Sequence, residues 1–157
     1  MSSELKVGLI GEVSQKVTEE DTAARWGSGL VDAYSTPALI ALTEKASVRA
    51  IEKFLSVNQA SVGVEVNVKH LAATPIGMVV KARAELVEID ERRLKFRIEA
   101  WDEKEKVCEG AHFRAIVDRS RFVNRLMQKG RRVTRETLAC HVCRFGTFRN
   151  VPRSETE

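Results

Sequence analysis

The chain has 157 residues, of which 43% are apolar and 31% are charged, and its formal net charge is +4. This length suits one domain, and the apolar content is enough for a buried core. No apolar run approaches the roughly 20 residues that a membrane-spanning helix needs, and the start lacks the pattern of a secretory signal. Three cysteines predict no disulfide framework and favour a reducing, cytoplasmic location.

The positive charge is concentrated at the C-terminal end. Over residues 128–157, seven Lys and Arg outnumber three acidic residues, an excess of four that equals the net charge of the whole chain. The balanced remainder argues against nucleic-acid binding through a basic body. We expect a domain at 1–128 and a basic, flexible extension at 129–157, with neither a nucleic-acid nor a membrane partner. Residues 119–128 fit either a closing helix or an extension of the last strand.

The first elements are a strand and a loop. Residues 7–17 predict a strand that two glycines interrupt. Residues 18–30 are polar and contain glycine, which indicates a loop with a short helical turn near residues 19–24. Because this loop precedes the main helix, it could cover a functional site.

Residues 37–55 predict the one long helix. Ser35 or Thr36 can cap its N-terminus, and Pro37 fits the first helical position. Glu44 lies on the apolar side of this helix, where a carboxylate is costly unless it is paired or used in chemistry. The apolar side chains that helical spacing places on that side are Ile40, Val48, Ile51 and Leu55.

The rest of the body predicts strands. Residues 61–70 alternate valine with polar or small residues, and by this period His70 ends the valine face. Three further strands at about 78–89, 94–100 and 106–118 follow, with short turns that imply an antiparallel meander. A single long helix must bury its apolar side against a sheet. We therefore predict an α+β fold in which a long central helix is wrapped by a curved antiparallel sheet of about five strands.

Three side chains suggest chemistry. Thr36 stands at the helix start, Glu44 follows two turns later, and His70 ends the next strand. A hydroxyl, a carboxylate and an imidazole are the components of nucleophilic or general-base catalysis. Each also has an ordinary structural interpretation, namely a helix cap, an ion pair and a packed core histidine.

Three segments resemble the fluoroacetyl-CoA thioesterase family of hotdog proteins. They are residues 36–50 (TPALIALTEKASVRA), 66–77 (VNVKHLAATPIG) and 110–115 (GAHFRA), within a resemblance that spans about residues 6–127. The resemblance implies a hotdog fold and hydrolysis of an acyl-CoA thioester to a carboxylic acid and free coenzyme A. It also implies a homodimer, or a dimer of dimers, with active sites near the subunit interface. The coenzyme A thioester is the substrate, and no separate cofactor is implied.

The same resemblance implies roles for particular residues. The family's catalytic threonine, glutamate and histidine fall on Thr36, Glu44 and His70. The glycine and arginine that hold the reacting carbonyl or water fall on Gly63 and Arg114. A departure concerns residues 26–31, which lack the aromatic side chains with which the fluoroacetyl-specific member shields its site. The acyl group is therefore left open.

Two other features receive structural interpretations. His112 shares a strand face with Arg114, and we expect it to serve packing. Cys140 and Cys143 form a single C-x-x-C pair, whereas a structural zinc ion needs four ligands, so we predict no metal site.

Two alternative functions use the same fold. One is a protein that binds acyl-CoA without hydrolysing it, and the other is a hydratase or dehydratase. Intact Thr36, Glu44 and His70 argue against the first alternative. The second uses a histidine with an acid in a motif that the sequence does not show.

Overall fold

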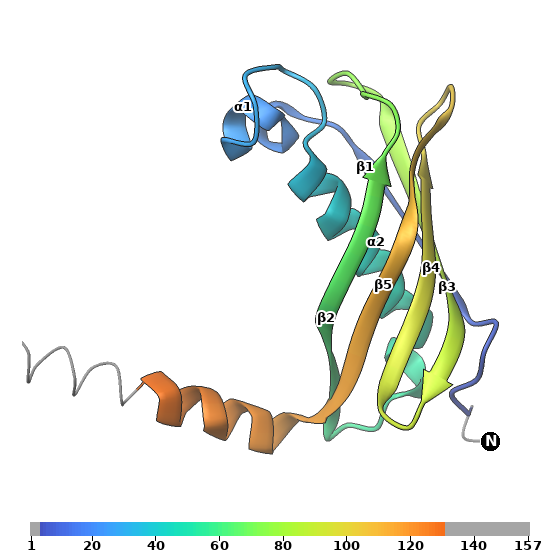
Figure 1. The fold of residues 1–157 in the computed structure, drawn as a ribbon, viewed down its shortest axis with the longest axis vertical. Coiled ribbons are helices and arrows are strands. Elements are labelled where there is room, and N and C mark those ends of the chain that lie inside the picture. The colour runs from blue at the N-terminus through green and yellow to red at the C-terminus, as the bar shows by residue number, and fades with distance from the viewer. Residues whose placement is uncertain (1–3, 131–157) are drawn as a thin grey trace, which may run out of the picture. The chain divides into compact units, whose positions relative to one another are not determined.

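The computed structural model describes residues 4–130. Five strands form one antiparallel sheet in the order β1-β3-β4-β5-β2, and the long helix α2 lies along the inner face of this curved sheet (Figure 1). The predicted α+β fold is therefore confirmed. The elements are β1 (Ile10–Lys16), η1 (Glu19–Asp21), α1 (Ala23–Trp26), α2 (Thr36–Ile51), η2 (Glu52–Phe54), β2 (Gln59–His70), β3 (Val79–Asp90), β4 (Arg93–Trp101) and β5 (Lys106–Asp118).

Helix α2 begins where the capping residues predict. The Ser35 side chain accepts a hydrogen bond from the Ala38 amide at 3.2 Å, and Pro37 occupies the first turn, where no amide donor is needed. Ser35 rather than Thr36 is thus the cap. The threonine hydroxyl at the helix start is left for another partner.

The buried side of α2 differs from the predicted one. Ile51 is buried as expected, but Ile40, Val48 and Leu55 are only partly buried. Small side chains let the sheet come close to the helix, and a Cβ at Gly11 of β1 would collide with helix backbone. The residues that face the core are Ala38, Leu39, Leu42, Thr43, Ala46, Ser47, Ala50 and Ile51.

Strand β2 carries a bulge that its regular sequence conceals. Gly63 pairs with Arg114 of β5, but the next paired residue is Glu65, so Val64 has no direct partner. One extra residue reverses the inward and outward alternation on either side of it. The prediction that all four valines share one face with His70 is therefore wrong. Val64 is 66% exposed, and Gly63 turns to the inner face instead.

The sheet leads into a helix at residues 119–130, so the last strand does not continue. The described chain divides after Arg119, and residues 120–130 belong to a unit separate from the sheet and α2. Most of the predicted basic extension, including the C-x-x-C pair, lies outside the described residues. Within residues 4–130, no helix is long and apolar enough to cross a membrane.

Candidate active site

Thr36 and His70 meet at one end of α2. The Thr36 Oγ1 lies 2.9 Å from the His70 Nδ1, which joins the first residue of α2 to the last residue of β2. The chain segments on either side hold this pair together. The Tyr34 amide donates to the Thr74 carbonyl at 2.9 Å, so the approach to α2 is tied to the turn that follows β2.

The environment of His70 favours a neutral imidazole. Burial lowers the pKa of His70 below its ordinary value, and the nearby backbone of Ala72 opposes this shift. The ring's Nε2 is buried and makes no hydrogen bond within residues 4–130. A neutral ring with one unused nitrogen can accept or deliver a proton at neutral pH.

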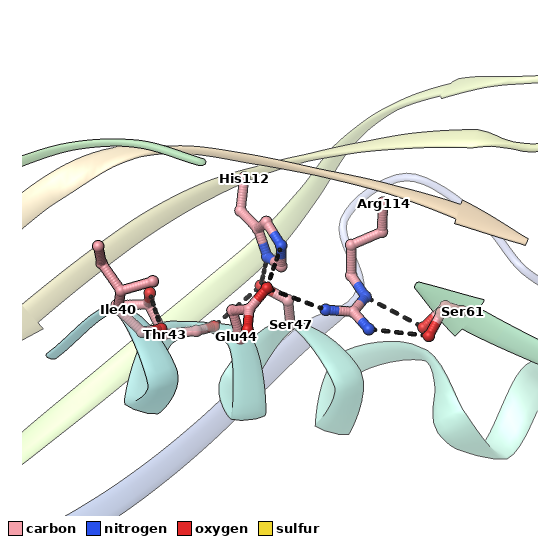
Figure 2. Close-up of polar contacts among 7 residues, drawn as sticks. All are labelled: Ile40, Thr43, Glu44, Ser47, Ser61, His112 and Arg114. Atoms are coloured by element: carbon pink, nitrogen blue, oxygen red, sulfur yellow. Dashed lines mark hydrogen bonds and ion pairs between the residues drawn. The ribbon is translucent and has the colours of Figure 1, made fainter. Parts of the chain in front are cut away.

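Glu44 meets a different set of side chains. Its Oε1 lies 3.1 Å from the His112 Nε2 and 3.9 Å from the Arg114 Nη1. Figure 2 marks both contacts with dashed lines. Both partners are buried residues of β5, whereas the Glu44 side chain is 40% exposed. The partly buried carboxylate that helical spacing predicts is therefore paired, and its exposed side is open to a ligand.

Arg114 is held by β2. Its Nε donates to the Ser61 Oγ at 3.0 Å, and its Nη2 donates to the Ser61 carbonyl at 2.9 Å (Figure 2). Because these bonds fix the guanidinium, its remaining nitrogen is directed at the Glu44 carboxylate. Gly63 lies opposite, and a Cβ there would come within 2.6 Å of the Glu44 Oε1.

The five predicted site residues therefore form two clusters. Thr36 and His70 make one, and Glu44, Gly63 and Arg114 make the other. Glu44 lies eight positions after Thr36 on α2, which corresponds to about 12 Å along the helix axis. Within residues 4–130, no hydrogen bond or ion pair joins the Glu44 carboxylate to the imidazole of His70.

His112 adjoins the second cluster, although the sequence prediction assigned it to packing. It is buried, but it also contacts the Glu44 carboxylate and the Ser47 hydroxyl. The sequence feature that could have indicated a site role for His112 is its position two residues before Arg114, on the same face of the same strand. Register across the bulge places it opposite Val66, on the side that faces the helix.

An open groove of about 700 Å³ runs along α2 and reaches the second cluster. Glu44 and Arg114 lie in its wall, together with Ala41 and Val48 of the helix and Val13 of β1. Within residues 4–130, no three His, Cys, Asp or Glu side chains are arranged to hold a metal ion. The chemistry available to these residues is that of acids, bases and hydrogen-bond donors.

Comparison with known proteins decides the family. Residues 17–120 match the family model described as fluoroacetyl-CoA-specific thioesterase. The chain belongs to this family. A fluoroacetyl-CoA thioesterase of Streptantibioticus cattleyicolor is 35% identical over 98 residues, which are 62% of this chain and 70% of that protein.

Solved structures agree with this family and with the hotdog fold. The fluoroacetyl-CoA thioesterase FlK superposes with a TM-score of 0.77 at 28% identity, covering 81% of this chain and 98% of its own. A mutant of that thioesterase in complex with acetyl-CoA gives a TM-score of 0.76. A Thermus thermophilus thioesterase superfamily member shares the fold, with a TM-score of 0.77 at 24% identity over 82% of this chain and 96% of its own.

Proposed function

We propose that this protein is an acyl-CoA thioesterase that hydrolyses a coenzyme A thioester to a carboxylic acid and free coenzyme A. The observation that carries the proposal is the Thr36–His70 pair, 2.9 Å apart at the N-terminus of α2. Membership of a thioesterase family supports the reaction class. The groove that Glu44 and Arg114 line supplies space for a substrate.

The helix start suits the developing charge of the reaction. Attack on the thioester carbonyl creates an oxyanion, and the free amides and dipole of a helix N-terminus stabilise a negative charge. Thr36 would orient the reacting group there, and the neutral His70 would move a proton toward the departing thiolate. Glu44 would either attack the carbonyl carbon or take a proton from the attacking water.

An isotope experiment separates the two roles of Glu44. In a single turnover in ¹⁸O-labelled water, a carboxylate nucleophile becomes labelled when water attacks its anhydride at the Glu44 carbonyl carbon, whereas attack at the acyl carbon labels only the product. A general base leaves the label in the acid product alone and forms no anhydride, so borohydride added during the turnover would reduce Glu44 only when the carboxylate is the nucleophile. Mass spectrometry of the peptide that contains Glu44 would measure the difference.

We further propose a homodimer, either alone or as a dimer of dimers, whose second subunit completes the site. The separation of about 12 Å along α2 keeps Glu44 from the Thr36–His70 pair of its own subunit. Strand β2 is an edge of the sheet, so one side of its backbone is available for pairing. Val64 on this edge and Val48 beside Glu44 leave apolar surface accessible. A dimer across this region would bring Glu44 of one subunit toward the Thr36–His70 pair of the other.

The acyl group and the location complete the proposal. The segment before α2 presents Trp26, Leu30 and Val31 as exposed apolar side chains, which suit an acyl chain rather than fluoroacetate in particular. A cytoplasmic location, where coenzyme A thioesters are available, accords with the free thiol of Cys108. We propose no cofactor besides the substrate.

The test is thiol release from a panel of acyl-CoAs of increasing chain length. We expect turnover of at least one acyl-CoA, and a loss of at least 100-fold in kcat for His70→Ala and Thr36→Ala. His141 lies outside the described residues, and the control variant His141→Ala should change kcat little. Tight binding of an acyl-CoA without thiol release would instead support a binding protein. Hydration of an enoyl-CoA without thiol release would support a hydratase.

A further inference from the structure

The hydrogen bonds of Ser47 determine which nitrogen of His112 carries a proton. The Ser47 Oγ donates its single hydrogen to the Thr43 carbonyl at 3.0 Å, because a carbonyl can only accept. The same oxygen lies 3.0 Å from the His112 Nδ1 and can therefore only accept from it. The Nδ1 of His112 thus holds a hydrogen in either charge state of the ring.

The second ring nitrogen of His112, Nε2, lies against the Glu44 carboxylate. If the ring is neutral, Nε2 presents a lone pair, and it does so 3.1 Å from the Glu44 Oε1. An ionised carboxylate at that distance would place two lone pairs against each other. Within residues 4–130, no hydrogen bond of good geometry reaches this Nε2, and the His112 side chain is fully buried. One further proton, on either group, removes the repulsion.

We propose that His112 is a positioning residue for Glu44 and that the two side chains hold one proton between them. The proposal rests on the proposed thioesterase function only for the consequence that Glu44 is used in catalysis. The shared proton fixes the Glu44 Oε1, while no hydrogen bond or ion pair within residues 4–130 engages Oε2. That second oxygen is the one directed to the substrate.

Two charged side chains, Glu44 and Arg114, lie beside His112 and act on its pKa in opposite directions. Glu44 faces it from α2 and Arg114 adjoins it on β5, whereas β4 contributes the Phe96 ring and β2 contributes Val66 and Gly63, none of which titrates. Burial lowers the pKa of His112 and Arg114 lowers it further, and Glu44 opposes both without reversing the shift, so the pKa stays below its ordinary value. Glu44 is thus the only group on these elements that favours the charged ring.

Nuclear magnetic resonance of ¹⁵N-histidine protein tests the pair without any substrate. The chain has three histidines, so His112 can be assigned from the His112→Gln variant. We expect a hydrogen on Nδ1 of His112 at high pH in the wild type, and loss of this tautomer preference in Ser47→Ala. In Glu44→Gln the pKa of His112 should fall by about one unit or more. His70→Gln, the matched control, should leave the His112 titration unchanged.

Kinetics tests the consequence for Glu44. Gln at position 112 can donate to Oε1 but cannot titrate, so His112→Gln should retain kcat within about tenfold and lose one ionisation from the pH–rate profile. His112→Leu should lower kcat about 100-fold with a small change in KM. Circular dichroism would establish that both variants fold.

The outcomes are separable. A His112 titration that is identical in the wild type and in Glu44→Gln would overturn the shared proton, whatever the enzyme's activity. An unchanged kcat in His112→Leu would overturn the positioning role. Absence of turnover in the wild type on every acyl-CoA would count against the proposed function and leave the resonance test of the proton pair intact.

Discussion

Replacing Gly63 with alanine should separate activity from stability. A Cβ at this position would lie 2.6 Å from the Glu44 Oε1 and 3.3 Å from the His112 Nε2. Ordinary contacts begin at 3.4 Å, so the carboxylate must retreat by the difference between 3.4 and 2.6 Å, which is 0.8 Å. A displacement of this size breaks the 3.1 Å approach to His112. Because misplacement of a catalytic group by about 1 Å can lower the reaction rate about 10²-fold, we expect kcat to fall about 30- to 100-fold.

Stability should change little in the same variant. The crowded oxygen is the end of a flexible side chain, and alanine reduces the freedom of the unfolded chain by about 0.4–1 kcal/mol. We therefore expect a melting temperature within about 4 °C of the wild type. Gly11→Ala is the contrasting control, since its Cβ would meet the Ala46 carbonyl and the Ala50 amide of the helix backbone, which cannot retreat. That variant should lose about 3 kcal/mol.

The measurements are thiol release at saturating acyl-CoA and thermal unfolding followed by circular dichroism. An unchanged kcat in Gly63→Ala would refute the argument that the position of the Glu44 carboxylate sets the rate. A loss of stability as large as that of Gly11→Ala would refute the argument that the side chain yields. Either result would show that the close approach at Gly63 has another purpose.

Substitutions at His70, Ser35 and Val64 test the burial of the histidine, the cap of α2 and the proposed dimer. Burial lowers the pKa of His70, so the folded protein binds fewer protons than the unfolded chain between the lowered value and the ordinary value of about 6.5. The contribution of His70 to the unfolding free energy is therefore complete above about pH 6.5 and is lost as the pH falls through the folded pKa. Urea titrations should show a smaller loss of unfolding free energy at acidic pH for His70→Gln than for the wild type. Ser35→Ala removes the cap of α2 and should cost about 1 kcal/mol of unfolding free energy, with the activity of the folded enzyme within about twofold of the wild type. Val64→Lys places a charge on the edge strand and should shift the mass measured by light scattering from dimer to monomer, with a parallel loss of activity, whereas Val57→Lys, at a 92% exposed position, should change neither. A monomeric wild type, or a Val64→Lys dimer, would contradict the proposed interface.

The order and type of the elements are local properties, and local patterns predict them. The cap and proline before α2 mark its start, and the two short turns mark the meander of β3, β4 and β5. The position of His70 at the end of β2 and of Thr36 at the start of α2 also follows from the sequence, and their 2.9 Å contact places both predicted residues at one end of the helix. A resemblance in motif spacing then connects these positions to thioester chemistry.

Only the tertiary structure decides which faces and which partners these residues have. The bulge at Val64 reverses which side chains of β2 face inward, because β2 gains one residue relative to β5. An uninterrupted valine repeat does not predict this bulge. Alanines share the core side of α2 with Leu39, Leu42 and Ile51, and the small residues lie where the curved sheet approaches the helix closely at Gly11. Sequence alone therefore determines that a hydroxyl, an acid and an imidazole are present. The register of β2 against β5 and the closeness of the sheet decide that the acid pairs with His112 and Arg114, since side-chain contacts between distant segments depend on packing that no local pattern encodes.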